Sequence, residues 1–325
     1  LLDADRKGIH THGLYRMNRY MEQLARKDIN PRPKIITVKT NKETIALMDG
    51  DHGLGAVIGH IAMENAIELS KKYGVGITGV KNSNHFGTAG YFSELAAKKN
   101  QIGLVFSNSS PSIAPTGSKK PILGNNPWSI SVPTDQGFFI TLDISNGKVA
   151  RGKIRLAKEK GQKIPRDWAL DADGNPTTDP AEALEGIILP MGDHKGYGIT
   201  LMIEILAGVL TGADFGTKMI GLDEKGQRNV GHLFVSIDIP SLMDIDEFYK
   251  KINQLIEMIN SAPPIDYKQE VLLPGEREWT NKQTYTEDVW LSRETLQVIY
   301  RQCKVFSIDL SGTRLFNRSE LFPDE

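Results

Sequence analysis

Helix-like hydrophobic spacing at both ends of the chain encloses a middle region whose apolar runs are short and strand-like. Residues 1–28 predict an amphipathic helix, whose apolar face has three-to-four spacing through Leu14, Met17, Tyr20, Met21 and Leu24. Residues 244–262 show the same helical spacing before a Pro-Pro pair. Because elements at the two ends share this helical character, we expect the termini to pack together. The sequence therefore predicts a helical domain from residues 1–40 and 241–325, and a sheet domain over residues 41–240.

The same spacing predicts individual elements. Strands are expected over residues 44–48, 75–80, 102–107, 128–132, 138–143 and 230–239. Helices are expected over residues 56–72, 88–99, 199–210, 244–262 and 293–303, with Ser292 as the cap of the last one. The run over residues 199–210 is so apolar that a buried helix is predicted there.

Charge and composition exclude several functional classes. The 325 residues carry 39 Lys and Arg against 40 Asp and Glu, so a nucleic-acid-binding surface is not expected. No apolar run reaches the roughly 20 residues that a membrane span needs. Cys303 is the lone cysteine, which excludes an internal disulfide and indicates a reducing cytoplasm. The chain starts at Leu1 without a methionine, and we expect a further segment before it.

The stretch Gly53-Leu54-Gly55-Ala56-Val57-Ile58-Gly59 looks like a Rossmann phosphate loop between a strand and a helix. Its third glycine comes one residue late, and no acidic residue follows the next strand to bind a ribose hydroxyl. A glycine-rich turn with close helix packing is the better interpretation.

His85 is the first candidate for proton transfer. It lies in Lys81-Asn82-Ser83-Asn84-His85-Phe86-Gly87, directly after a predicted strand. An imidazole has an unperturbed pKa of about 6.5, and strand ends commonly carry the chemistry of α/β enzymes. The alternative is a structural histidine bonded to the backbone.

A second histidine, His12, stands four residues before Arg16, so the two share a face if the segment is helical. An arginine fork bonds a carboxylate in two places, and a nearby imidazole would act on the hydroxyl or keto group beside it. The alternative is a surface helix end with solvated side chains.

Two more stretches are candidates for ligand contacts. Lys195, in Gly192–Gly198, opens a helix where free backbone donors suit a phosphate or carboxylate, unless the segment is only an exposed helix start. Asp143-Ile144-Ser145 ends a strand and would bind a ribose or an amide, unless it caps the next element.

Five motifs follow one another along the chain: Asp5–Gly13, Asn82–Gly87, Pro115–Gly117, Val149–Lys153 and His194–Gly198. In this order they resemble the type 2 malate/L-lactate dehydrogenase family, whose members also act on ureidoglycolate, sulfolactate and diketogulonate. The resemblance runs from near Leu1 to about Glu276.

The resemblance implies a homodimeric oxidoreductase that uses NAD or NADP. Its mixed α/β fold is of the sulfolactate dehydrogenase type rather than a Rossmann fold, with a central sheet domain covered by helices from both termini. His85 matches the proton acceptor of some members, His12 matches the proton donor of others, and Arg16 would hold the substrate carboxylate. Cofactor contacts are implied for Ser109, Asp143, Ile144, Ser145, Lys195, Gly275, Glu276 and Arg277.

Malate is the substrate predicted first, because a dicarboxylate would use a cation such as Arg151 as well as Arg16. Lactate, ureidoglycolate and sulfolactate are alternatives within the family. A dinucleotide-binding protein without turnover is a second class, and a lyase or isomerase that uses the same imidazoles is a third. The family often has glycine where Asp193 stands, which changes the charge beside the cofactor. The tail after Cys303 has no counterpart in the resemblance.

Overall fold

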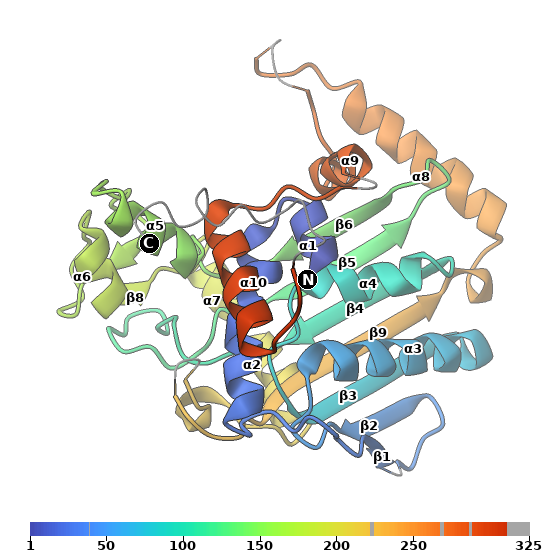
Figure 1. Cartoon of the computed structure of the whole chain (residues 1–325). Helices are drawn as coiled ribbons and strands as arrows, with labels where there is room; N and C mark the ends of the chain where they lie inside the picture. Colours follow the sequence, from blue (N-terminus) through green and yellow to red (C-terminus); the bar gives the residue numbers. More distant parts are fainter. Residues whose placement is uncertain (39, 222–223, 267–269, 286–287, 311–325) are drawn as a thin grey trace.

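A mixed sheet forms the centre of the molecule (Figure 1). The computed structural model describes residues 1–38, 40–221, 224–266, 270–285 and 288–310. In these residues the strand order is β1-β2-β3-β9-β4-β5-β6, and β2 and β3 are the parallel neighbours in an otherwise antiparallel sheet. The strands are β1 (Ile36–Val38), β2 (Ile45–Asp49), β3 (Val75–Ser83), β4 (Gln101–Ser107), β5 (Trp128–Pro133), β6 (Phe139–Ile144) and β9 (Val230–Asp238).

Helices cover both faces of this sheet. Helices α3 (Gly55–Tyr73) and α4 (Ala89–Ala97) pack on β3, β9, β4 and β5, and Phe92 and Phe234 meet edge to face at 5.8 Å in the core between them. Helix α7 (His194–Ile203) continues into a π-helical segment, Glu204–Val209, that packs on the other face. Because β9 is covered on both sides, its first five residues are all buried instead of alternating.

The strands and the core helices predicted from hydrophobic spacing are confirmed, with ends that shift by a few residues. Ser292 caps α10 (Arg293–Val305) as predicted, since its hydroxyl oxygen accepts the N–H of Thr295 at 3.2 Å. The buried helix predicted over residues 199–210 is only half correct, because Met202, Val209 and Leu210 are exposed. Within the described residues, no helix combines the length and apolar character that a bilayer span requires.

The glycines of the apparent phosphate loop serve close packing. A Cβ on Gly55, the first residue of α3, would come within 2.1 Å of the carbonyl oxygen of Asn84. A Cβ on Gly59 would lie 2.9 Å from the ring of Phe92 on α4. The antiparallel neighbours of the sheet also differ from Rossmann topology, so the turn-and-packing interpretation is confirmed.

A single helix over residues 1–28 was expected, and this prediction is wrong. The segment forms α1 (Leu2–Arg6), two 3-10 turns (His10–His12 and Leu14–Arg16) and α2 (Met17–Ala25). The buried carboxylate of Asp5 accepts the N–H of Leu14 at 2.7 Å, and Gly13 lies so close that a Cβ there would clash with that carboxylate. This tertiary contact folds the chain back between Asp5 and Leu14.

Elements from the two ends of the chain lie side by side (Figure 1). Helix α1 packs against α9 (Glu276–Thr284), and α2 packs against α10. Helix α8 (Ile245–Asn260) contributes Ile256 to a hydrophobic cluster with Phe138, just before β6, and Trp279 of α9 packs against that cluster. The division into domains at residues 40 and 241 stays a prediction. Strand β1 belongs to the sheet although it precedes residue 40. Within the tail after Cys303, residues 311–325 lie outside the described residues.

A small lobe between β6 and α7 was not predicted. It contains α5 (Arg151–Glu159), α6 (Pro180–Glu185) and a two-stranded sheet of β7 (Ala169–Leu170) and β8 (Ile187–Ile188). Its own hydrophobic cluster includes Ile154, Ala169 and Ile188. Strands of two residues are too short to show a period in the sequence.

Candidate active site

His85 follows β3 on a segment that is fixed on both sides. The side-chain amide of buried Asn84 donates to the carbonyls of His52 and Gly53 at 2.9 and 3.0 Å. On the other side, Phe86 stacks at 4.5 Å on the ring of His232, which is held between two serine hydroxyls. These contacts leave the imidazole of His85 little freedom.

The His85 ring meets two side chains from the N-terminal segment. His12 lies parallel to it, with ring centroids 5.7 Å apart and planes 21° apart. The Tyr20 hydroxyl oxygen, from α2, lies 2.6 Å from Nδ1 of His85. The folded chain therefore brings His12 and His85 together, as the two-histidine hypothesis requires.

Both imidazoles are neutral at physiological pH. Burial, helped by the charge of Arg16, lowers the pKa of His12 to about 4. Burial and the neighbouring His12 and Arg16 also hold the pKa of His85 well below its usual value. A neutral imidazole can accept a proton or donate its single N–H in a hydrogen bond.

Arg16 lies beside these rings with part of its guanidinium available. Its Nε donates to the carbonyl of Thr11 at 2.7 Å. In the described part of the chain, its two terminal nitrogens have no hydrogen-bond partner. Burial lowers the pKa of Arg16, but a guanidinium keeps its charge at neutral pH. A partly desolvated cation with two aligned donors suits a carboxylate.

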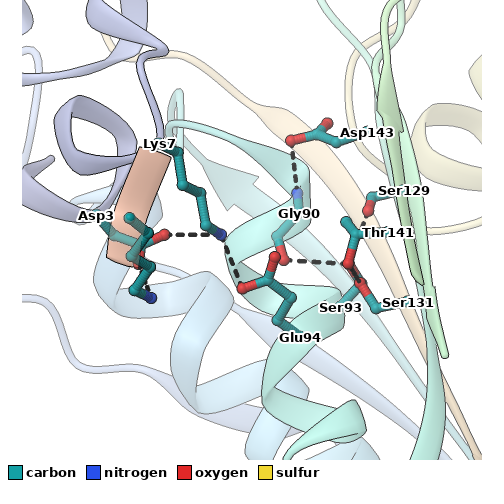
Figure 2. A network of polar contacts seen from close by, with 10 residues as sticks. Asp3, Lys7, Gly90, Ser93, Glu94, Ser129, Ser131, Thr141 and Asp143 are labelled. Carbon is teal, nitrogen blue, oxygen red and sulfur yellow. Dashed lines mark hydrogen bonds and ion pairs between the residues drawn. The ribbon is translucent and has the colours of Figure 1, made fainter. Parts of the chain in front are cut away.

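A cavity of about 180 Å³ lies beside the part of the chain that follows His85. Its walls include Thr88, Gly90, Asp143, Ile144 and Gly275. The Asp143 carboxylate accepts the N–H of Gly90 at 2.9 Å, near the start of α4 (Figure 2). Burial raises the pKa of Asp143 to about 6, so its carboxylate is ionised at neutral pH.

Ion pairs tie the wall of this cavity to the helices of both termini (Figure 2). The ammonium of Lys7 lies 2.7 Å from Glu94 on α4 and 2.9 Å from Asp3 on α1. Lys282 of α9 reaches Asp3 at 2.6 Å. Burial alone would lower the pKa of Lys7, but the carboxylates of Glu94 and Asp3 raise it above the usual value. The charges compensate each other, and they connect α1, α4 and α9.

Ser109 is joined through an asparagine to the helix that carries Lys195. The Ser109 N–H donates to the side-chain oxygen of Asn126 at 3.0 Å, and the Asn126 amide donates to the carbonyl of Thr200 and to Glu204 at 3.0 and 2.5 Å. Lys195 is the second residue of α7, and its side chain is exposed.

The other predicted contact residues differ in their surroundings. Ser145 is half-buried directly after β6. In α9, the Glu276 carboxylate accepts the N–H of Leu273 at 2.8 Å, and Arg277 is exposed. The structure thus gathers Asp143, Ile144 and Gly275 around one cavity.

Two residues that contact the site were missed in the sequence. Tyr20 was assigned to the apolar face of a helix, although it follows Arg16 by one helical turn. Lys7 lies within the Asp5–Gly13 motif but was given no role of its own. The four-residue spacing of Arg16 and Tyr20 was the available signal for the first of them.

Neutral imidazoles beside an available guanidinium suit the exchange of a proton with an anionic hydroxy acid, on a mixed α/β fold that is not of the Rossmann type. A site and a fold of this kind define the class of 2-hydroxy-acid dehydrogenases. A sequence profile described as malate/L-lactate dehydrogenase matches residues 1–299. The chain belongs to that family, and the resemblance seen in its motifs is confirmed.

Named relatives agree with this membership. The malate/(S)-sulfolactate dehydrogenase of Methanothermus fervidus is 40% identical over 313 residues, 96% of this chain and 90% of the relative. The structure of sulfolactate dehydrogenase from Methanocaldococcus jannaschii is similar with a TM-score of 0.87 and 40% identity, over 95% of this chain and 89% of that one. Malate dehydrogenase from Entamoeba histolytica gives 0.90 at 30% identity, over 95% and 90%. The predicted fold class is confirmed.

Proposed function

We propose that this protein interconverts malate and oxaloacetate with a nicotinamide dinucleotide. The observation that carries the proposal is the meeting of three side chains from two distant segments. The neutral imidazoles of His12 and His85 stack, and the guanidinium of Arg16 lies beside them. Arg16 holds the carboxylate next to the reacting carbon, and an imidazole nitrogen takes the hydroxyl proton during oxidation.

The residues around the cavity suit a dinucleotide. In the cavity wall, the ionised carboxylate of Asp143 is an acceptor for ribose hydroxyls. Lys195 does not line this cavity, but at the exposed start of α7 it offers a cation to a phosphate. Gly275 has φ +86° and lies so near Thr141 that a Cβ would approach within 3.0 Å, so only a bare backbone fits there. When bound, the nicotinamide supplies the acceptor for the hydride that leaves the hydroxyl-bearing carbon.

Relatives of this chain are named for each of the two nicotinamide dinucleotides. A ureidoglycolate dehydrogenase of Escherichia coli O157:H7, 32% identical, is named for NAD(+). A (2R)-3-sulfolactate dehydrogenase of Chromohalobacter salexigens, 37% identical, is named for NADP(+).

The charges around Arg16 favour a substrate with two anionic groups. Arg19 and Arg155 lie close enough that their positive charges help to lower the pKa of Arg16. Arg155 belongs to α5, the same helix as Arg151, and the guanidinium of Arg151 donates to the carbonyl of Leu184. Arg155 adds a positive charge near Arg16 that suits the second carboxylate of malate. Sulfolactate carries the same pair of charges and is the second candidate, whereas lactate has one.

A screen of malate, sulfolactate, lactate and ureidoglycolate, each with NAD and NADP, tests the proposal through nicotinamide absorbance. We expect malate to give the highest kcat/KM, and a dianion to exceed lactate. If fluorescence shows that the dinucleotide binds but no acid changes its absorbance, the protein is a dinucleotide-binding protein without turnover. Conversion of a hydroxy acid without added cofactor would instead indicate a lyase or an isomerase.

Two further properties are part of the proposal. The family resemblance supports a homodimer, which sedimentation of the purified chain measures. The lone Cys303 supports a cytoplasmic location, which fractionation of the native cell measures.

A further inference from the structure

Tyr20 has one hydrogen-bond partner among the described residues, and that partner is the candidate active-site ring. Its side chain is buried, at 8% exposure, and its oxygen lies 2.6 Å from Nδ1 of His85. Burial raises the pKa of Tyr20 to about 12, although the charges of Arg16 and Arg19 pull it down. The hydroxyl therefore keeps its proton at neutral pH and needs an acceptor for it.

This need decides which nitrogen of His85 carries the ring proton. A neutral imidazole has one N–H donor and one acceptor nitrogen. If Nδ1 carried the proton, the buried Tyr20 hydroxyl would have to accept it and would have no acceptor of its own among the described residues. An unsatisfied buried donor is costly, so the arrangement with Tyr20 donating to Nδ1 is the more stable one.

We propose that Tyr20 is a positioning residue that holds His85 in the tautomer with its proton on Nε2. Nε2 has no partner among the described residues, so it presents an N–H to the site. Given the proposed function, on which this part rests, that N–H donates to the oxygen on C2 of the acid. Such a donor stabilises negative charge that develops on the oxygen when a keto acid is reduced. His12 is then the ring left to exchange the hydroxyl proton.

Nitrogen NMR of the full chain with ¹⁵N-labelled histidine tests the tautomer without any assay of activity. The His85 signals are assigned by their loss in His85→Gln. In the wild type we expect the coupling pattern of a ring protonated on Nε2, and in Tyr20→Phe a shift towards a mixture of tautomers. An Nδ1-protonated ring in the wild type would overturn the proposal. An Nε2-protonated ring that Tyr20→Phe leaves unchanged would also overturn it.

Kinetics separates positioning from packing. Tyr20→Phe keeps the ring and removes the donor, and we expect kcat for reduction of oxaloacetate to fall about tenfold to a hundredfold, with an unchanged KM for the cofactor. The matched control is Tyr73→Phe, which removes a hydroxyl bonded to Glu43 at 2.8 Å on the far end of α3 and should change neither value. Wild-type kcat in Tyr20→Phe would contradict the role.

The NMR spectrum tests the tautomer of His85, and the kinetics test the malate chemistry, so each result can contradict one proposal without the other. If Tyr20→Phe does not fold, the wild-type spectrum alone still decides the tautomer. If the Nε2 tautomer is found but no acid is turned over, the positioning of His85 stands and the proposed malate chemistry falls.

Discussion

The imidazole rings of His12 and His85 lie nearly parallel, 5.7 Å apart, although one comes from a 3-10 turn near the N-terminus and the other from the loop after β3. The turn is held by Asp5, and the loop is held by Asn84 and by the stacking of Phe86 on His232. The two supports are independent, so substitutions can test each side of the site separately.

Arg16→Lys should weaken the binding of the acid but not of the cofactor. A lysine keeps the charge but loses the planar pair of donors that a carboxylate needs. We expect kcat/KM for malate to fall about tenfold to a hundredfold, with an unchanged Kd for the dinucleotide. Arg26→Lys is the control, because Arg26 pairs with Asp28 just after α2. Equal effects of the two variants would contradict a role for Arg16 in substrate binding.

Gly55→Ala should displace the His85 segment and so lower both stability and turnover. The added methyl would lie 2.1 Å from the carbonyl oxygen of Asn84 and 2.6 Å from that of His85, so the His85 segment has to move. Overpacking of this kind costs about 1–3 kcal/mol, measured by urea unfolding, and turnover should fall with it. Gly198→Ala, which meets no atom of the described residues within 4 Å, should instead stabilise helix α7 by up to about 1 kcal/mol. Unchanged stability in Gly55→Ala would show that the segment adapts freely.

Asp193→Gly should stabilise the protein. Asp193 has φ +53° and ψ −116°, a backbone region that suits glycine, and its side chain makes no capping hydrogen bond to α7. We expect a gain of about 1 kcal/mol in the free energy of unfolding. Asp51→Gly is the contrast: φ is also positive there, but its carboxylate accepts two hydrogen bonds at 2.9 Å, so this variant should lose stability. A destabilised Asp193→Gly would show an unrecognised role for the aspartate.

Binding of the dinucleotide should depend on pH through Asp143. Its pKa is raised to about 6, and only the ionised carboxylate accepts a hydrogen bond from a ribose hydroxyl without donating one. The affinity should therefore be constant above pH 7 and weaken as the pH falls through 6. Asp143→Asn should bind more weakly at pH 7 and lose this dependence, as measured by nicotinamide fluorescence. An identical pH dependence in that variant would assign the titration to another group.

Hydrophobic period was sufficient to predict the strands and the helices of the core, because burial repeats locally along each element. It failed where distant residues decide the backbone. The single N-terminal helix was wrong because Asp5 binds Leu14 and packs on Gly13, which no local pattern encodes. The lobe around Ile154 was missed because its strands are too short for a period.

The site shows the same division. Spacing alone paired His12 with Arg16 and left His85 as a separate candidate, and the motif resemblance was needed to place the three together. Tyr20 was missed because its place in the helical repeat also predicts a core residue. The role we propose for it depends on His85, 65 positions away, whose Nδ1 the folded chain brings to 2.6 Å from the Tyr20 hydroxyl oxygen.

Turnover by His85→Ala, compared with its binding of nicotinamide, is the sharpest test of the imidazole pair. A positioned proton-transfer or hydrogen-bonding imidazole contributes about 10²–10⁴-fold to rate. We therefore expect kcat for malate to drop within that range in His85→Ala, and also in His12→Ala, while fluorescence titration gives an unchanged dinucleotide Kd. A His85→Ala protein that turns over malate at nearly the wild-type rate would remove His85 from the chemistry.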